Sequence, residues 1–261
     1  MRINGLANWS SLHQTLGADC LRIASYNVHG CVGRDGAADV SRIAGVIRET
    51  ACAVVGLQEV GTLSDHRHDR LQLDALEHAT GMTAIAGNTI VREGASFGNA
   101  LLTSHPVIAV RRHDFSYNRC EPRGALEVDV DVVGTSVRVF VTHLGLWPSE
   151  RRFQVGQMLK LLRDIPADHL VVVLGDINEW LPLGRPLRWL HGVLGHVPAE
   201  RSFPAWLPLF ALDRVWVRPR HALLAFAAHR TVAAREASDH LPVKALIATR
   251  LPPAGSKTAT G

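Results

Sequence analysis

Short apolar runs that each lead into a polar side chain recur along this chain of 261 residues. The clearest is residues 170–174, five consecutive aliphatic residues that are followed by Gly175 and Asp176. A strand without polar positions is usually buried on both faces, as in α/β proteins. Residues 53–57 form another apolar run, and residues 21–27, LRIASYN, also indicate a buried strand. We therefore expect buried strands that are covered by helices.

Four segments carry apolar residues at helical spacing, and we predict that each is a helix. They are residues 39–50, in which Asp39 suits the N-cap, 70–79, 150–164 and 185–194. Four β-rich runs follow one another in the middle of the chain, at residues 99–103, 107–114, 125–133 and 136–142. Gly134 and Thr135 separate the last two runs and predict a tight hairpin turn. Further strands are expected at 212–217, 223–227 and 241–248.

The hairpins in the middle of the chain argue against a purely parallel sheet. No internal repeat and no linker-like change of composition divides the sequence. We therefore predict one α/β domain over residues 21–249, in which mixed sheets pack face to face with helices outside. Residues 1–20 are expected to form an irregular arm, and residues 250–261 a disordered tail.

The composition excludes several classes of protein. With 47% hydrophobic and 20% charged residues, the chain resembles an ordinary globular protein. No apolar run approaches the roughly 18–20 residues that cross a bilayer, and no secretory signal is evident, so we expect a soluble cytoplasmic protein. The four cysteines form no C-x-x-C pair, which predicts free thiols and makes zinc unexpected. A net charge of +4 permits an anionic substrate without requiring one.

Polar residues at the ends of the predicted strands are the candidates for chemistry. They are Asn27, Glu59, His143, Asp176, Asn178, Asp213, Asp239 and His240. Ligands of α/β proteins gather where strands end, because several loops converge there. Carboxylate and amide oxygens suit Mg²⁺ or Mn²⁺, and imidazoles suit proton transfer or hydrogen bonding to phosphate.

Eight short blocks occur in a characteristic order. They are SYNVHG, LQEV, GNALLTS, EPRGAL, THLG, GDIN, LDRVWV and SDHLPV, and the similarity around them runs from about residue 21 to residue 248. In this the chain resembles the endonuclease/exonuclease/phosphatase superfamily, which includes pancreatic deoxyribonuclease, apurinic endonucleases, sphingomyelinases and inositol polyphosphate 5-phosphatases. The resemblance implies a four-layered α-β-β-α sandwich and a metal-dependent phosphoester hydrolase.

The resemblance also implies a metal site and a water site. Glu59 would bind the metal directly, and Asn27 and Asp239 would complete its shell directly or through water. The implied cofactor is Mg²⁺, with Mn²⁺ as the alternative. Asp176 would orient or deprotonate the attacking water, and Asn178 would hold that water or the phosphate.

The remaining implied roles concern the phosphate. His240 would contact the scissile phosphate with its orientation fixed by Asp213, and His143 would bind another phosphate oxygen. Arg123 is the best guanidinium candidate for the phosphate, because Arg forms paired bonds with phosphate oxygens. Its alternative is a surface arginine. Asn99 is a further phosphate-binding candidate, and its alternative is a structural role in a turn.

The substrate is less constrained than the reaction. GDINEW and the later SFP and LDR blocks resemble a group of small bacterial members, some of which are linked to phospholipid metabolism. Residues 203–210 are mostly apolar and lie shortly before Asp213. They could contact a membrane or an acyl chain, or they could pack into the core, and their composition favours the core.

Two alternatives to a lipid phosphodiesterase stay open. One is a DNA nuclease, in which scattered arginine pairs contact the phosphate backbone. The other is a non-catalytic binding module, although its catalytic positions would then be expected to be replaced. No obligate protein partner is evident. We expect no second metal site at residues 66–68.

Overall fold

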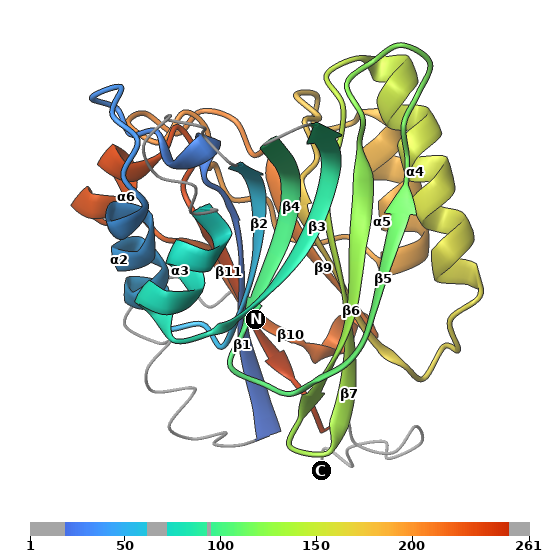
Figure 1. Ribbon diagram of the computed structural model, residues 1–261. Coiled ribbons are helices and arrows are strands. Elements are labelled where there is room, and N and C mark those ends of the chain that lie inside the picture. Colours follow the sequence, from blue (N-terminus) through green and yellow to red (C-terminus); the bar gives the residue numbers. More distant parts are fainter. Residues whose placement is uncertain (1–18, 62–71, 93–94, 251–261) are drawn as a thin grey trace.

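The computed structural model describes residues 19–61, 72–92 and 95–250. Two β-sheets pack face to face at its centre, and helices cover the outer face of each sheet (Figure 1). The predicted four-layered α-β-β-α sandwich is thereby confirmed. Several predictions fall outside the described residues: the arm up to residue 18, the loop at 66–68, the start of the helix predicted from residue 70, and the tail from residue 251.

The first sheet has six strands in the order β10-β11-β1-β2-β4-β3. Strand β1 runs parallel to β2 and antiparallel to β11. The bounds are β1 (Cys20–Asn27), β2 (Val54–Gly61), β3 (Thr83–Arg92), β4 (Ala95–Thr103), β10 (Leu223–Ala228) and β11 (Val243–Ala248). The parallel pair matters for function, because β1 and β2 end at the same edge of the sheet.

The second sheet has five strands in the order β5-β6-β7-β8-β9. Strands β7 and β8 are parallel, whereas β9 is antiparallel to β8. The bounds are β5 (Val107–Asp114), β6 (Gly124–Val132), β7 (Thr135–His143), β8 (Leu170–Asp176) and β9 (Asp213–Arg218). The ends of β7 and β8 and the start of β9 therefore meet at one edge.

The helices form the outer layers. Helices α2 (Val40–Thr50), α3 (Gln72–Thr80) and α6 (Val232–Ala237) pack on the first sheet, and α4 (Pro148–Arg163) and α5 (Arg185–Leu194) pack on the second (Figure 1). The described residues also form two short 3₁₀ turns, η2 (His29–Cys31) and η3 (Arg220–Ala222). Asp39 is the N-cap of helix α2, as predicted, because its side chain accepts a hydrogen bond from the backbone nitrogen of Arg42.

The inner layer explains the apolar run in β8. Val172 and Leu174 face the first sheet, whereas Val171 and Val173 face the helices, so both faces of the strand are buried. The two sheets approach closely at Gly56 of β2. A Cβ atom at this position would lie 2.2 Å from Cδ1 of Leu174, which is closer than real contacts allow.

The structure corrects some boundaries. Strand β3 was not predicted, because its glycine and asparagine interrupt the alternation of apolar residues in an edge strand. Helix α6 was also missed, since six residues are too few for a periodic pattern. Strand β11 begins at Val243 rather than at residue 241, after Pro242, which has no N–H to donate to a ladder.

The β6–β7 turn is shifted by one residue from its prediction. Its central residues are Val133 and Gly134, with φ angles of 52° and 83°. A two-residue hairpin turn of type I′ needs positive φ at both central positions. The prediction placed the turn at Gly134 and Thr135, between the two β-rich runs, and a valine at positive φ is too uncommon to be expected from sequence.

Two other predictions can be compared with the described residues. All four cysteines are free, as expected. No helix in this part of the chain is long and apolar enough to span a membrane.

Candidate active site

The strand ends of both sheets meet around one cavity. The register of the second sheet pairs His143 with Asp176 and Asp176 with Asp213. Asn27 ends β1 and pairs with Gln58, the residue before Glu59 in the neighbouring strand β2. The cavity at this edge has a volume of about 330 Å³.

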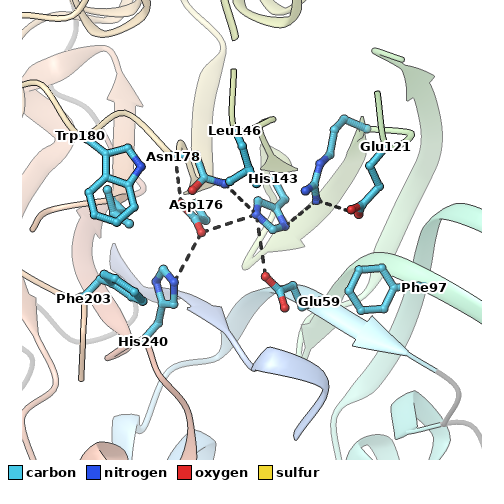
Figure 2. A pocket seen from close by; sticks show the side chains of 12 residues that line it. Glu59, Phe97, Glu121, His143, Leu146, Asp176, Asn178, Trp180, Phe203 and His240 are labelled. Carbon is cyan, nitrogen blue, oxygen red and sulfur yellow. Dashed lines mark hydrogen bonds and ion pairs between the residues drawn. The ribbon is translucent and has the colours of Figure 1, made fainter. Parts of the chain in front are cut away.

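The cavity contains most of the candidates predicted from the sequence (Figure 2). Its lining includes Glu59, Arg123, His143, Asp176, Asn178 and His240. The other lining residues are Phe97, Glu121, Leu146, Trp180, Phe203 and Leu212. Among the remaining candidates, Asn27 and Asp213 contact the lining residues, whereas Asn99 and Asp239 are not part of the lining.

Glu59 owes its direction to an irregularity in β2. The pairing of β2 with β4 shifts between Leu57 and Val60, and Glu59 has a left-handed φ of 58°. Such a bulge re-aims a side chain, and strained backbone of this kind clusters at functional sites. Burial opposes the charge of Glu59, but His29 and His143 outweigh it and lower its pKa to about 2. Glu59 is therefore ionised at neutral pH.

Asn27 joins the two sheets. Its Nδ2 donates to Oε1 of Glu59 at 3.0 Å and to Oδ2 of Asp176 at 3.2 Å. Its Oδ1 accepts from the backbone nitrogen of His29 at 3.0 Å. Asn27 thus holds two carboxylates together with its amide nitrogen, and direct ligation of a metal by its oxygen stays a prediction.

Asp176 is the centre of the polar network. Its Oδ1 accepts from the backbone nitrogen of Asn178 at 2.9 Å. Its Oδ2 lies 3.5 Å from Nε2 of His143 and 3.6 Å from Nε2 of His240. An acceptor between two imidazoles is well placed to orient a water or to exchange a proton with it.

A buried hydrogen-bonded chain orients His240. Its Nδ1 lies 2.8 Å from Oδ2 of Asp213, and the Ser202 hydroxyl donates to the same oxygen at 2.5 Å. Burial opposes the positive charge of His240, but Asp213 and Asp176 outweigh it and raise its pKa to about 10. His240 is therefore a cation at neutral pH, and its Nε2 is directed at the cavity.

His143 is held in the opposite charge state. The guanidinium of Arg123 lies 2.9 Å from Nδ1, and because Arg can only donate, Nδ1 must accept. Burial lowers the pKa of His143 to about 4, and Arg123 acts in the same direction against Asp176. The neutral imidazole then carries its proton on Nε2. Nδ2 of Asn178 lies 3.0 Å from this atom but donates to the carbonyl oxygen of Leu144, so it is a neighbour of the Nε2–H group and not its acceptor.

Two predicted residues are connected less directly. Asn99 is buried, and its amide nitrogen donates to the carbonyl oxygen of Gly124, beside Arg123. This contact supports the backbone next to the site, and the predicted phosphate contact of Asn99 stays a prediction. Asp239 is partly exposed and faces His29, whose Nδ1 lies 3.7 Å from its Oδ2.

One wall of the cavity is aromatic. Trp180 packs edge-on against Phe203 and Phe210, with ring centroids 5.6 Å and 4.8 Å apart. Phe203 in turn lies against His240 at 4.8 Å. Figure 2 shows this wall on the side of the cavity opposite Phe97 and Glu121. Aromatic side chains therefore extend from the imidazole of His240 to the surface.

The aromatic wall continues into an exposed hairpin, which we call the 203–210 hairpin. Phe203 and Phe210 pair across it, and Ala205 alone among its apolar side chains is fully buried. Trp206 is 54% exposed, and Leu207 and Leu209 are also exposed. Phe210 is exposed as well, so the favoured prediction that this segment packs into the core is wrong for these four residues. Apolar composition alone could not reveal that they project outward.

Three functional candidates were missed by sequence reasoning. Ser202 orders the His240–Asp213 pair, Trp180 builds the aromatic wall, and His29 faces Glu59 and Asp239. Each lies in or beside a block that the sequence analysis quoted, namely SFP, GDINEW and SYNVHG. Position within a block was the available signal, but it did not distinguish these residues from their neighbours.

The donor set fits a divalent cation. Glu59 and Asp176 offer carboxylate oxygens on either side of the Asn27 amide, and oxygen ligands are those that Mg²⁺ and Mn²⁺ prefer. Donor atoms of Asp176, Asp213 and His240 also lie within 4.8 Å of one another. In that group, however, one oxygen of Asp213 is already hydrogen-bonded to both His240 and Ser202.

Comparison with known proteins agrees with this geometry. Residues 24–240 match the model of the Endonuclease/Exonuclease/phosphatase family. The chain belongs to this family. Its members are generally metal-dependent hydrolases of phosphoester bonds.

The chain is also similar to individual proteins. The chain is 31% identical over 173 residues to the uncharacterized protein YbhP of Escherichia coli (strain K12), covering 63% of this chain and 67% of that protein. An endonuclease/exonuclease/phosphatase from Beutenbergia cavernae superposes with a TM-score of 0.69 at 23% identity, covering 88% of this chain and 72% of that one. Truncated Caenorhabditis elegans TDP2 gives a TM-score of 0.65 at 16% identity, covering 89% and 99%.

Proposed function

We propose that this protein is a divalent-metal-dependent phosphodiesterase that acts on lipid-type phosphodiesters. The observation that carries the proposal is the continuity of the catalytic cavity with the aromatic wall and the exposed 203–210 hairpin. A phosphoester site needs only polar groups for its chemistry. The apolar side chains that lead from His240 to the surface are therefore available for an apolar part of the substrate.

The phosphate would be bound by donors from both sheets. His240 offers a charged N–H, and His143 offers a neutral N–H, both toward the space in front of Asp176. The guanidinium of Arg123 lines the cavity between His143 and Glu121, and it would donate to a further phosphate oxygen. Donors fixed before the reaction stabilise the charge that develops on phosphate in the transition state.

Asp176 would prepare the attacking water. Asn178 fixes Oδ1 of this carboxylate through its backbone nitrogen, and Oδ2, which accepts from Asn27 and faces both imidazoles, would take the proton from water. Glu59 and Asp239, with Asn27, would hold the divalent cation, whose chemistry is to neutralise charge on the nonbridging oxygens. His240 is a cation and can give its Nε2 proton to the leaving alcohol, while Asp213 keeps the ring in place.

The surface beside the cavity suits an anionic lipid layer. The guanidinium carbon of Arg34 lies 6.0 Å from the ring centroid of Trp206. Arg235 donates a hydrogen bond to the backbone oxygen of Trp206 at 3.1 Å. Exposed aromatic side chains next to basic ones are typical of proteins that rest on membranes. Contact through residues 203–210 would bring the cavity to the lipid headgroups.

A substrate panel tests the proposal. The metal-loaded protein would be assayed on vesicles of phosphatidylglycerol or phosphatidylcholine, single-stranded DNA, abasic duplex DNA and bis(p-nitrophenyl) phosphate. We expect hydrolysis of the aryl phosphodiester and of a lipid. A zebrafish TDP2 structure holds a single-stranded DNA product, so the nuclease is a real alternative. Efficient cleavage of DNA with no lipid turnover would establish that alternative.

A surface variant sharpens the test. Trp206→Ser should lower hydrolysis of vesicle lipid several-fold while leaving bis(p-nitrophenyl) phosphate turnover unchanged, because the polar network is untouched. Ile108→Ser is the matched control, since Ile108 is 57% exposed and lies near the start of β5, at the end of the second sheet remote from the cavity. A buried Trp would cost roughly 3–5 kcal/mol when removed, so a melting temperature close to wild type is also expected. Equal loss on both substrates would contradict a role in lipid contact.

A further inference from the structure

His29 stands out because the functions assigned so far do not use it. It lies two residues after Asn27, the last residue of β1, and opens the 3₁₀ turn η2. His29, Gly30 and Cys31 have φ angles of 50°, 61° and 61°. Three consecutive residues in the left-handed region are uncommon and fix the direction in which the imidazole leaves the backbone.

The imidazole is directed at two of the predicted metal ligands. Its Nδ1 lies 3.6 Å from Oε2 of Glu59 and 3.7 Å from Oδ2 of Asp239. The side chain is 47% exposed, so it stands at the open side of the site rather than in the core. Its backbone is held as well, since its nitrogen donates to Oδ1 of Asn27 at 3.0 Å.

These separations suit ligands of one ion. Around an octahedral cation with bonds of about 2.1 Å, adjacent ligand atoms are roughly 3.0 Å apart and opposite ones roughly 4.2 Å apart. The distances from His29 to Glu59 and to Asp239 fall between these values. Small movements of the side chains would bring this nitrogen and the two carboxylates to the same ion.

We propose that His29 is a nitrogen ligand of the divalent metal, so that the site holds a mixed nitrogen and oxygen set and selects Mn²⁺ over Mg²⁺. Mg²⁺ is bound almost entirely by oxygen and gives up its waters reluctantly. Imidazole is a better ligand for first-row transition ions, because it is softer than carboxylate or water. An imidazole in the shell therefore contributes more to the binding of Mn²⁺ than to that of Mg²⁺.

A competing explanation is that His29 merely neutralises the carboxylates. In that case an incoming cation would displace the imidazole. Substituting His29 would then leave the selectivity between Mn²⁺ and Mg²⁺ unchanged, or it would strengthen the binding of both ions. The two explanations thus predict opposite effects of the same substitution. Metal binding, rather than turnover, separates them.

The experiment uses the full chain stripped of metal with a chelator and titrated with Mn²⁺ or Mg²⁺ alone. His29→Asn is the test variant, because Asn tolerates the left-handed backbone but lacks the imidazole. We expect its Mn²⁺ affinity to fall by about tenfold or more, the lower end of the range for disturbed metal sites, while Mg²⁺ affinity changes little. His169→Asn is the control, since this half-exposed histidine precedes β8 at the end remote from Asp176.

Pulsed electron paramagnetic resonance of bound Mn²⁺ gives a second readout. The wild-type protein should show coupling to a ¹⁴N nucleus, and His29→Asn should lose it. His29→Gly, which also suits positive φ, excludes an effect of the new amide oxygen. Absence of ¹⁴N coupling in the wild type, or its persistence in both variants, would overturn the proposal. Neither readout requires a known substrate, so the result stands apart from the proposed phosphodiesterase activity.

Discussion

His143 and His240 are two buried histidines of one cavity, yet they are held in opposite charge states. His143 comes from β7 and faces the guanidinium of Arg123, whereas His240 comes from the loop before β11 and faces the carboxylate of Asp213. Burial alone would make both neutral. Burial keeps the pKa of His143 low, and Arg123 acts in the same direction, whereas Asp213 and Asp176 outweigh burial at His240 and raise its pKa. One half of the cavity offers a neutral donor and the other a charged acid.

The largest effect is expected from breaking the His143 half. Arg123→Met removes the group that obliges Nδ1 of His143 to accept, together with a predicted phosphate ligand. The value of kcat/KM on bis(p-nitrophenyl) phosphate should fall by about 10²–10³, as for the loss of a fixed transition-state donor. The kcat/KM of Arg123→Lys should lie between those of the wild type and Arg123→Met, since Lys keeps the charge but lacks the planar guanidinium. Near wild-type kinetics in folded Arg123→Met would remove Arg123 from the site.

A smaller effect is expected from breaking the His240 half. Asp213→Asn keeps the shape of the side chain but removes the charge beside His240, and turnover should fall roughly 10–100-fold. Mn²⁺ affinity, measured on the same preparation, should stay the same, because Asp213 bonds to His240 and Ser202. Lost Mn²⁺ affinity with unchanged turnover per bound ion would instead place Asp213 among the metal ligands.

The smallest effect concerns stability, and its sign differs between the two histidines. An unfolded His titrates near pH 6.5. His143, with a pKa of about 4 in the fold, makes the protein lose stability as the pH falls from about 6.5 toward 4. His240, with a pKa of about 10 in the fold, contributes stability below pH 6.5 that is lost as the pH rises toward 10.

Urea unfolding of the metal-free protein from pH 4.5 to 9.5 measures both effects. His143→Gln should flatten the acid limb of the stability curve, and His240→Gln should flatten the alkaline limb. The buried His229 serves as a reference, because its pKa is also lowered by burial but it contacts Glu49 away from the cavity. If both substitutions altered the same limb, the assigned charge states would be wrong.

The sequence predicted the positions whose environment follows from the strands. Asn27 and Glu59 were found because parallel strands end at one edge of a sheet, and Asp176 because it follows a wholly apolar strand. The two packed sheets were also predictable, since hairpins and helical segments alternate along the chain. These features depend on local pattern and on general rules of sheet topology.

The sequence could not predict features that depend on backbone geometry or on distant contacts. The orientation of His29 follows from three left-handed residues, of which only Gly30 signals such a conformation. The exposure of Trp206 depends on pairing within the 203–210 hairpin, and apolar composition favoured the core instead. The tautomer of His143 and the charge of His240 depend on partners that are 20 and 27 residues away.

The two sheets approach each other closely at Gly56, and the distance between them affects the geometry of the cavity. Asn27 belongs to the first sheet and Asp176 to the second, and a single hydrogen bond of 3.2 Å joins them across the gap. The sheets are otherwise spaced by packed side chains such as Leu174, which leaves no room for a Cβ atom at Gly56. A methyl group at Gly56 would push the sheets apart, so a residue outside the cavity sets the distance between the predicted metal ligand Asn27 and the predicted catalytic carboxylate Asp176.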